Sequence, residues 1–242
     1  MGHDIQNIPL LNLALSFIPI LFALAILCKW SLESSNALYA LARMLVQLLL
    51  VGYLLSYIFN ADNAAIVITV LAIMVFASSW IALGTIPIKR NLLYKHAFLS
   101  IIVGGGFTLL VITQGVLNLK PWYLPQIIIP LAGMIFANAM NSVSLAAERI
   151  HAEIDRHVSY LEARRIALHA SLIPVINSLF AVGLVSLPGM MTGQILSGVS
   201  PLIAVRYQIM VMCMIFASSV LSAAFFLVLA KPIFSTRFTK PQ

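Results

Sequence analysis

Seven long apolar runs restrict how this chain can fold more than any other feature of its sequence. A helix that crosses the hydrocarbon core of a bilayer needs about 20 consecutive apolar residues, and runs of about 17 lie at the lower limit. The runs are continuous and do not alternate with a period of two, which excludes transmembrane strands. We therefore predict an all-α integral membrane protein with about seven transmembrane helices, at residues 8–28, 37–59, 64–84, 97–117, 126–147, 171–187 and 207–230.

The composition excludes a soluble globular protein. Of the 242 residues, 62% are hydrophobic and only 9% are charged, whereas about 25% of the residues in a soluble domain are charged. No long linker divides the chain, so we predict a single transmembrane domain over residues 1–242. The two cysteines, Cys28 and Cys213, lie in apolar runs and are expected to be buried thiols.

Basic residues between the runs predict the topology. When the loops are numbered alternately, one set holds eleven basic residues and the other holds only Lys120. Basic residues favour the cytoplasmic side, so we predict an outside N-terminus, a cytoplasmic C-terminus and a bacterial inner-membrane location. This asymmetry also explains the net charge of +7 without nucleic-acid binding. The eleven residues are Lys29, Lys89, Arg90, Lys95, Arg149, Arg156, Arg164, Arg165, Lys231, Arg237 and Lys240.

The longest polar segment, residues 148–170, separates the fifth and sixth runs. Its apolar residues recur at helical spacing, and Ser159 with Glu162 forms a capping-box pattern that predicts a helix starting near Tyr160. The segment is thus expected to be a cytosolic helical hairpin. From this pattern alone, it is either a solvated connector or a docking element for a cytosolic partner.

Several polar side chains lie within or beside the apolar runs, where they are costly unless they have a partner or a function. Asn138, Asn141 and Leu145 share one helix face by their spacing, and amides on such a face either bond to neighbouring helices or line a polar path. Arg43 and Gln47 lie one turn apart, so Arg43 either reaches the interface or faces the helix bundle. The candidate path residues are Arg43, Gln47, Asn138, Asn141, Asn177, Gln194 and Arg206.

No motif for enzyme chemistry or for a bound cofactor is present. The chain lacks a phosphate loop, a metalloprotease motif and a nucleophile elbow. Gly104-Gly105-Gly106 lies in an apolar run without a following lysine, so we interpret it as a site of close helix packing. We therefore predict that the chain is not an enzyme.

The segment after residue 187 is neutral and rich in glycine. It is predicted to lie on the outer side, where it could dip back into the membrane. Met190 and Met191 lie within it. Their thioethers either fill space or, as a weaker candidate, contact a soft metal ion.

The motifs of this chain resemble those of the FetB-type family of ABC transporter permeases. The resemblance rests on Pro130 to Met134, on Asn138-Ala-Met-Asn141, and above all on the run Leu187-Pro-Gly-Met-Met-Thr-Gly-Gln194, and it covers most of the chain. The resemblance implies a homodimeric permease that pairs with a separate ATP-binding subunit. Bacterial members are associated with iron export and metal resistance, and plant relatives with aluminium tolerance.

By position, the same resemblance implies coupling to the ATPase through Glu148, Arg149 and Glu153. The chain is thus expected to export iron or another metal. Two alternatives stay open: a partner-independent secondary transporter or channel, and a membrane scaffold without transport. An intramembrane Asp, Glu or His, which a proton-coupled carrier usually needs, is absent from the runs, and this argues against such a carrier.

Overall fold

A computed structural model of the chain describes residues 9–32, 34–60, 63–84, 86 and 90–235. These residues form helices and one isolated bridge, between Val182 and Ser186, and no strand is present among them. The all-α fold is confirmed. The structure does not describe three of the basic residues that predict the topology, Lys89, Arg237 and Lys240, or the first residue of the first predicted span.

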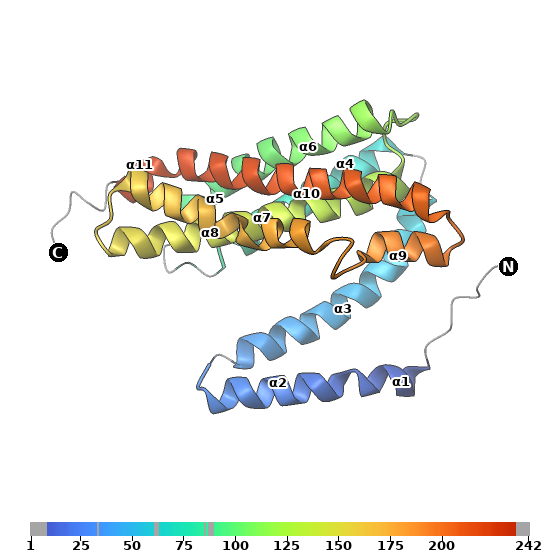
Figure 1. Cartoon of the computed structure of the whole chain (residues 1–242), viewed down its shortest axis with the longest axis horizontal. Helices are drawn as coiled ribbons and strands as arrows, with labels where there is room; N and C mark the ends of the chain where they lie inside the picture. The colour runs from blue at the N-terminus through green and yellow to red at the C-terminus, as the bar shows by residue number, and fades with distance from the viewer. Residues whose placement is uncertain (1–8, 33, 61–62, 85, 87–89, 236–242) are drawn as a thin grey trace. The chain divides into compact units, whose positions relative to one another are not determined.

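The chain divides into two compact units. The first unit holds α1 (Leu10–Leu15), α2 (Phe17–Lys29) and α3 (Ser34–Phe59), and α2 packs against α3. The second holds α4 to α11 (Figure 1). The bounds of its elements are α4 Ala64–Ala82, α5 Arg90–Ile101, η1 Ile102–Gly106, α6 Phe107–Leu110, η2 Val111–Val116, α7 Pro125–Asp155, α8 Tyr160–Ala181, α9 Gly189–Leu196, α10 Pro201–Leu229 and α11 Lys231–Ser235.

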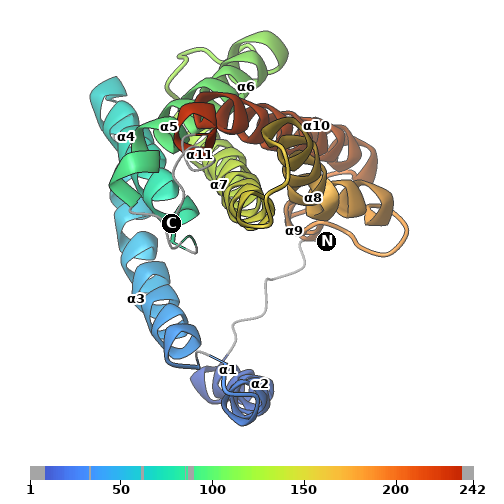
Figure 2. The same cartoon turned by 90° about the vertical axis from the view of Figure 1, so that its left-hand side faces the viewer.

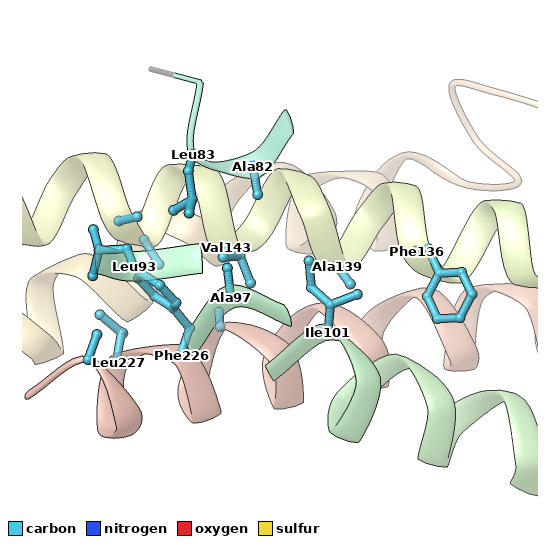
Figure 3. Close-up of a cluster of buried hydrophobic side chains, with 14 of the residues drawn as sticks. Ala82, Leu83, Leu93, Ala97, Ile101, Phe136, Ala139, Val143, Phe226 and Leu227 are labelled. Carbon is cyan, nitrogen blue, oxygen red and sulfur yellow. The ribbon is translucent and has the colours of Figure 1, made fainter. Parts of the chain in front are cut away.

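Helix α7 is the centre of the second unit. It packs against α4, α5, α8 and α10, and Figure 2 shows these helices around it. The buried side chains of this core are mainly aliphatic and small, and its aromatic members include Phe136 of α7 and Phe226 of α10 (Figure 3). Ala139 and Val143 are fully buried along the same face of α7. Small residues on this face allow the helices to approach closely.

The glycine triplet packs helices together, as the sequence predicts. A Cβ atom on Gly104 would lie 2.4 Å from the Ser222 Oγ and 2.6 Å from the Ser222 backbone nitrogen on α10. A Cβ atom on Gly105 would lie 2.9 Å from the ring of Phe136 on α7. The helix also widens to a π-helix at η1 and again at η2. Such bulges reposition side chains within a helix and are frequent at functional sites.

Six helices among the described residues are long and apolar enough to cross a membrane. This number agrees roughly with the expected seven. The predicted sixth span corresponds to α8, which begins with charged turns and ends at Ala181, six residues before the predicted end. Gly183, at φ +83°, begins a tight turn there. The single-domain assignment stays a prediction.

Aromatic side chains lie at both ends of the span Arg90–Val116. At its start, Trp80 and Tyr94 pack edge to face at 5.9 Å between ring centroids, and the Arg90 guanidinium lies 5.2 Å from the centroid of Trp80. Beyond its other end, Trp122 and Tyr123 pack at 5.8 Å. Tryptophan and tyrosine prefer the membrane–water interface, so their place at both ends of this helix is the one expected for a transmembrane span.

The helical hairpin between the fifth and sixth runs is present. Helix α7 continues to Asp155, His157 adopts φ +62°, and α8 begins at Tyr160 as expected. Ser159 is the N-cap, but its side chain makes no capping hydrogen bond. The expectation of buried thiols is wrong, because Cys28 and Cys213 are both exposed. In an apolar span, an exposed side chain faces lipid or another protein, so apolar surroundings in the sequence do not imply burial.

Candidate functional site

A small polar cavity lies between α7, α8 and α10. Its volume is about 80 Å³, and six of its nine lining residues are asparagines or serines. No charged residue lines it. The lining residues are Asn138, Asn141, Ser142, Leu145, Ser171, Pro174, Val175, Ser178 and Ser219.

Helix α7 contributes the two amides. Asn138, Asn141 and Leu145 all line the cavity, so the helix face that the sequence predicts is the one that borders it. The Asn138 Nδ2 donates a hydrogen bond to the Met134 carbonyl oxygen at 2.8 Å. This bond within the helix holds the amide in place and occupies a donor, so the carbonyl oxygen of the Asn138 side chain remains as an acceptor.

Helices α8 and α10 complete the cavity with hydroxyl groups. The Ser171 Oγ donates to the Leu168 carbonyl oxygen at 2.8 Å, and the Ser178 Oγ donates to the Pro174 carbonyl oxygen at 3.0 Å. Ser219 is buried, and its Oγ has no hydrogen-bond partner among the described residues. Sequence reasoning missed these three serines. The seven-residue spacing of Ser171 and Ser178, two turns of one helix, is the signal that could have found the first two.

The polar groups of this lining are all neutral amides and hydroxyls. Amide and hydroxyl oxygens suit water or a hard cation that keeps part of its hydration shell, whereas soft ions prefer sulfur. The described residues contain no group of three or more His, Cys, Asp or Glu side chains that could hold a metal ion. The arrangement is therefore suited to weak, transient contact with a polar solute.

The other predicted path residues lie elsewhere. Asn177 is exposed on α8, one position before Ser178, and does not line the cavity. Arg206 is exposed on α10, and Gln194 is half-buried on α9 with an unpaired Oε1. Arg43 and Gln47 are exposed on α3, in the other compact unit.

The two methionines do not form a common site. Met190 packs against the hydrophobic core of the second unit, whereas Met191 lines a separate apolar pocket. Their different surroundings favour a space-filling role over joint metal binding.

The three proposed coupling residues differ in exposure. Glu148 is exposed near the end of α7. Glu153 is only 5% exposed, and its Oε1 lies 2.7 Å from the Arg149 Nη2 and 3.7 Å from the Arg156 Nη1. Glu153 therefore pairs within the hairpin with two arginines that are themselves partly or largely exposed, and its own burial does not support a direct role in docking. Glu148 and Glu153 differ in exposure because of helical periodicity: five residues along α7 turn the side chain from the outer face of the helix to the inner one.

The start of α8 is joined to the end of α10. The Tyr160 hydroxyl donates to the Leu227 carbonyl oxygen, and the Lys231 Nζ lies 6.0 Å from the centroid of the Tyr160 ring. Burial raises the pKa of Tyr160 above its ordinary value of 10.0, and the nearby Arg164 opposes this shift. The hairpin is thus attached to α10, the helix that also carries Ser219 of the polar cavity.

Comparisons with known proteins find relatives of one family along most of the chain. A family model described as "Uncharacterised protein family (UPF0014)" matches residues 9–165 and 157–234. The chain is 40% identical over 208 residues to a UPF0014 membrane protein of Synechocystis, covering 78% of this chain and 79% of that protein. It is 34% identical over 241 residues to the "Probable iron export permease protein FetB" of Escherichia coli, covering 91% and 89%. It is 31% identical over 235 residues to "Protein ALUMINUM SENSITIVE 3" of Arabidopsis thaliana, covering 88% and 84%. No solved structure matches this chain.

Proposed function

The chain belongs to the UPF0014 family of membrane proteins, and from this premise we propose that it is the permease of an ABC-type exporter whose cargo is iron or another metal. The resemblance read from its motifs is confirmed by this family and by the relative named as a probable iron export permease. The observation that carries the proposal is the uncharged polar cavity among α7, α8 and α10.

The cavity is proposed to be a constriction on the path of the cargo. Its volume of about 80 Å³ holds only a few water molecules. A permeation site must bind well enough to admit an ion and weakly enough to release it. Neutral amide and hydroxyl oxygens meet this need, because they compensate part of the lost hydration without the strong attraction of a carboxylate cluster.

Substitutions of two asparagines test this path. Asn141→Leu replaces an amide of the cavity by an apolar side chain of similar size, and should raise the iron content of cells grown under iron load. Asn177→Leu is the matched control, because Asn177 is exposed, as Asn141 is, but does not line the cavity. The double change Met190→Leu with Met191→Leu should have little effect, since iron prefers oxygen ligands to thioethers when it is ferric.

Equal effects of Asn141→Leu and Asn177→Leu would remove the cavity from the path. If the methionine pair proves essential and Asn141 dispensable, the cargo is coordinated by sulfur instead. If none of these changes alters cellular iron, the cargo is a different solute.

A cytosolic ATPase is proposed as the source of energy, docking at the α7–α8 hairpin. ATP would then be hydrolysed by the partner, and no catalytic role is proposed for this chain. Glu148 is exposed there, so Glu148→Lys should weaken co-purification with the ATPase and uncouple its hydrolysis from export. Lys120→Glu, outside the hairpin, is the control, with a charge change of equal size and opposite sign. Export that continues without any ATPase would favour the secondary transporter or channel.

The orientation follows the basic residues, with the N-terminus outside and the C-terminus in the cytoplasm of a bacterial inner membrane. In a variant without Cys28 and Cys213, Lys120→Cys should react with an impermeant thiol reagent added outside, whereas Lys95→Cys should not. The reverse labelling would invert the topology. The permease is also proposed to act as a homodimer, which native mass spectrometry would register as twice the mass of one chain.

A further inference from the structure

A second pocket, apolar and separate from the polar cavity, lies within the second unit. The end of α8, the turn that follows it, α9 and the first half of α10 enclose about 390 Å³. Apolar side chains such as Leu187, Met191, Ile209 and Met212 form most of its wall. This volume falls in the range of about 300–1,000 Å³ that is typical of ligand sites, which are mainly apolar with a few placed polar groups.

Gln208 of α10 is the polar side chain of this wall. It is 5% exposed, and its Oε1 has no hydrogen-bond partner in the part of the chain that the structure describes. An unpaired amide oxygen is costly in water-free surroundings and costlier still at membrane depth. The pocket therefore presents one acceptor that a bound molecule with an N–H or O–H donor would satisfy.

Arg206 adds a positive charge at the edge of the pocket wall, on the other side of α10 from Gln208, because two residues turn the helix by about 200°. It is exposed, and it precedes Gln208 by about 3 Å along the axis of α10. Ile209 and Cys213, which follow Arg206 by three and seven residues, both line the pocket. This spacing places Arg206 on the same edge of the helix as these two residues. No ion pair of Arg206 is found among the described residues. An exposed arginine at this edge is suited to a phosphate group.

We propose that this pocket binds a phospholipid whose head group carries a hydrogen-bond donor, such as phosphatidylglycerol or phosphatidylethanolamine. The phosphate pairs with Arg206, the head-group hydroxyl or ammonium donates to the Gln208 Oε1, and an acyl chain packs against Met191, Ile209 and Met212. Phosphatidylcholine has the same phosphate and chains but no donor. It would therefore leave the Gln208 acceptor unpaired and bind more weakly.

The test is a competition among three lipids for the full-length protein. Delipidated protein is titrated with phosphatidylglycerol, phosphatidylethanolamine or phosphatidylcholine of identical chains, and bound lipid is counted by native mass spectrometry. We expect the first two to bind about tenfold more tightly than phosphatidylcholine. Gln208→Leu should remove this preference, and Arg206→Gln should weaken all three lipids by about fivefold.

Two further variants separate specific binding from general lipid contact. Gln114→Leu changes a glutamine that lines another apolar pocket, near Trp122, and should keep the preference. Ile209→Trp should fill the pocket and reduce binding of all three lipids, while Gln208→Met provides a second replacement should Gln208→Leu fold poorly. Equal binding of the three lipids by the unchanged protein, or a preference that survives both Gln208 substitutions, overturns the proposal. None of these readouts depends on transport.

Discussion

The two compact units have similar hydropathy and bury very different amounts of side chain. Helix α3 has 26 residues, of which only Ile58 is buried, whereas 16 of the 31 residues of α7 are buried. Yet the most apolar window of α3, with a mean hydropathy of 1.8, is more apolar than that of α7, at 1.5. Hydropathy therefore identifies helices that belong in a membrane, but it does not identify those that form a protein interior.

Small side chains mark the difference between the units. Gly52 of α3 has nothing within 4 Å of the position of a Cβ atom, whereas Gly104 lies directly against Ser222 of α10. Lipid chains are as apolar as leucine, so apolar helices gain little by leaving lipid unless they can approach each other closely. The helices of the second unit have that contact, and α1–α3 present leucine-rich surfaces that suit lipid or a partner.

The largest expected effect is that of Gly104→Val, compared with Gly52→Val. The new Cβ atom at residue 104 would lie 2.6 Å from the Ser222 backbone nitrogen, so α10 would have to move. Overpacking of this kind costs about 3 kcal/mol, whereas Gly52→Val should change stability by less than about 0.5 kcal/mol. Thermal unfolding in detergent measures both. Equal losses would show that α3 is as closely packed as the second unit.

An intermediate effect is expected at the hairpin, where Glu153→Gln tests whether the protein interior extends into the hairpin. The change removes the counter-charge of Arg149 and Arg156 at a buried position, and should cost about 2 kcal/mol because Arg149 itself is partly exposed. Glu162→Gln breaks the exposed pair with Arg165, which spans 2.9 Å, and should leave stability nearly unchanged because solvent screens exposed pairs. Similar losses from the two variants would mean that Glu153 is not held inside the molecule.

The smallest effect is expected for Tyr160→Phe, compared with Tyr53→Phe on α3. Loss of the hydrogen bond to Leu227 should cost about 1 kcal/mol, whereas Tyr53 is 84% exposed and its change should be neutral.

Tyr160 should also make stability depend on pH. Because its pKa is raised in the folded protein, the unfolded chain loses this proton first. The contribution of Tyr160 to the free energy of unfolding is therefore complete below pH 10.0, its ordinary pKa. This contribution is lost as the pH rises through the higher pKa of the folded state. Tyr160→Phe should reduce the loss of stability measured above pH 10, and Tyr53→Phe should leave it unchanged. A pH profile that Tyr160→Phe does not alter would show that this hydroxyl is not buried.

The sequence alone determined the class of the fold and much of its local structure. Continuous apolar runs predict transmembrane helices because the bilayer demands length and internal hydrogen bonding. The hairpin between the fifth and sixth runs, the start of α8 at Tyr160 and the packing role of Gly104 and Gly105 also follow from local pattern. The shared face of Asn138 and Asn141 does too, since their spacing on one helix places both amides together wherever that helix packs.

Only the tertiary structure decided what those faces meet. It placed Ser171, Ser178 and Ser219 opposite the two asparagines, and it left Asn177 outside the cavity although it is a neighbour of Ser178. It also buried Glu153 while Glu148, five residues earlier, is exposed. One helical position is a turn of about 100°, so the rotation of each helix about its axis decides which polar residue faces inward. That rotation is set by contacts between helices that are distant in the sequence, and local pattern does not contain it.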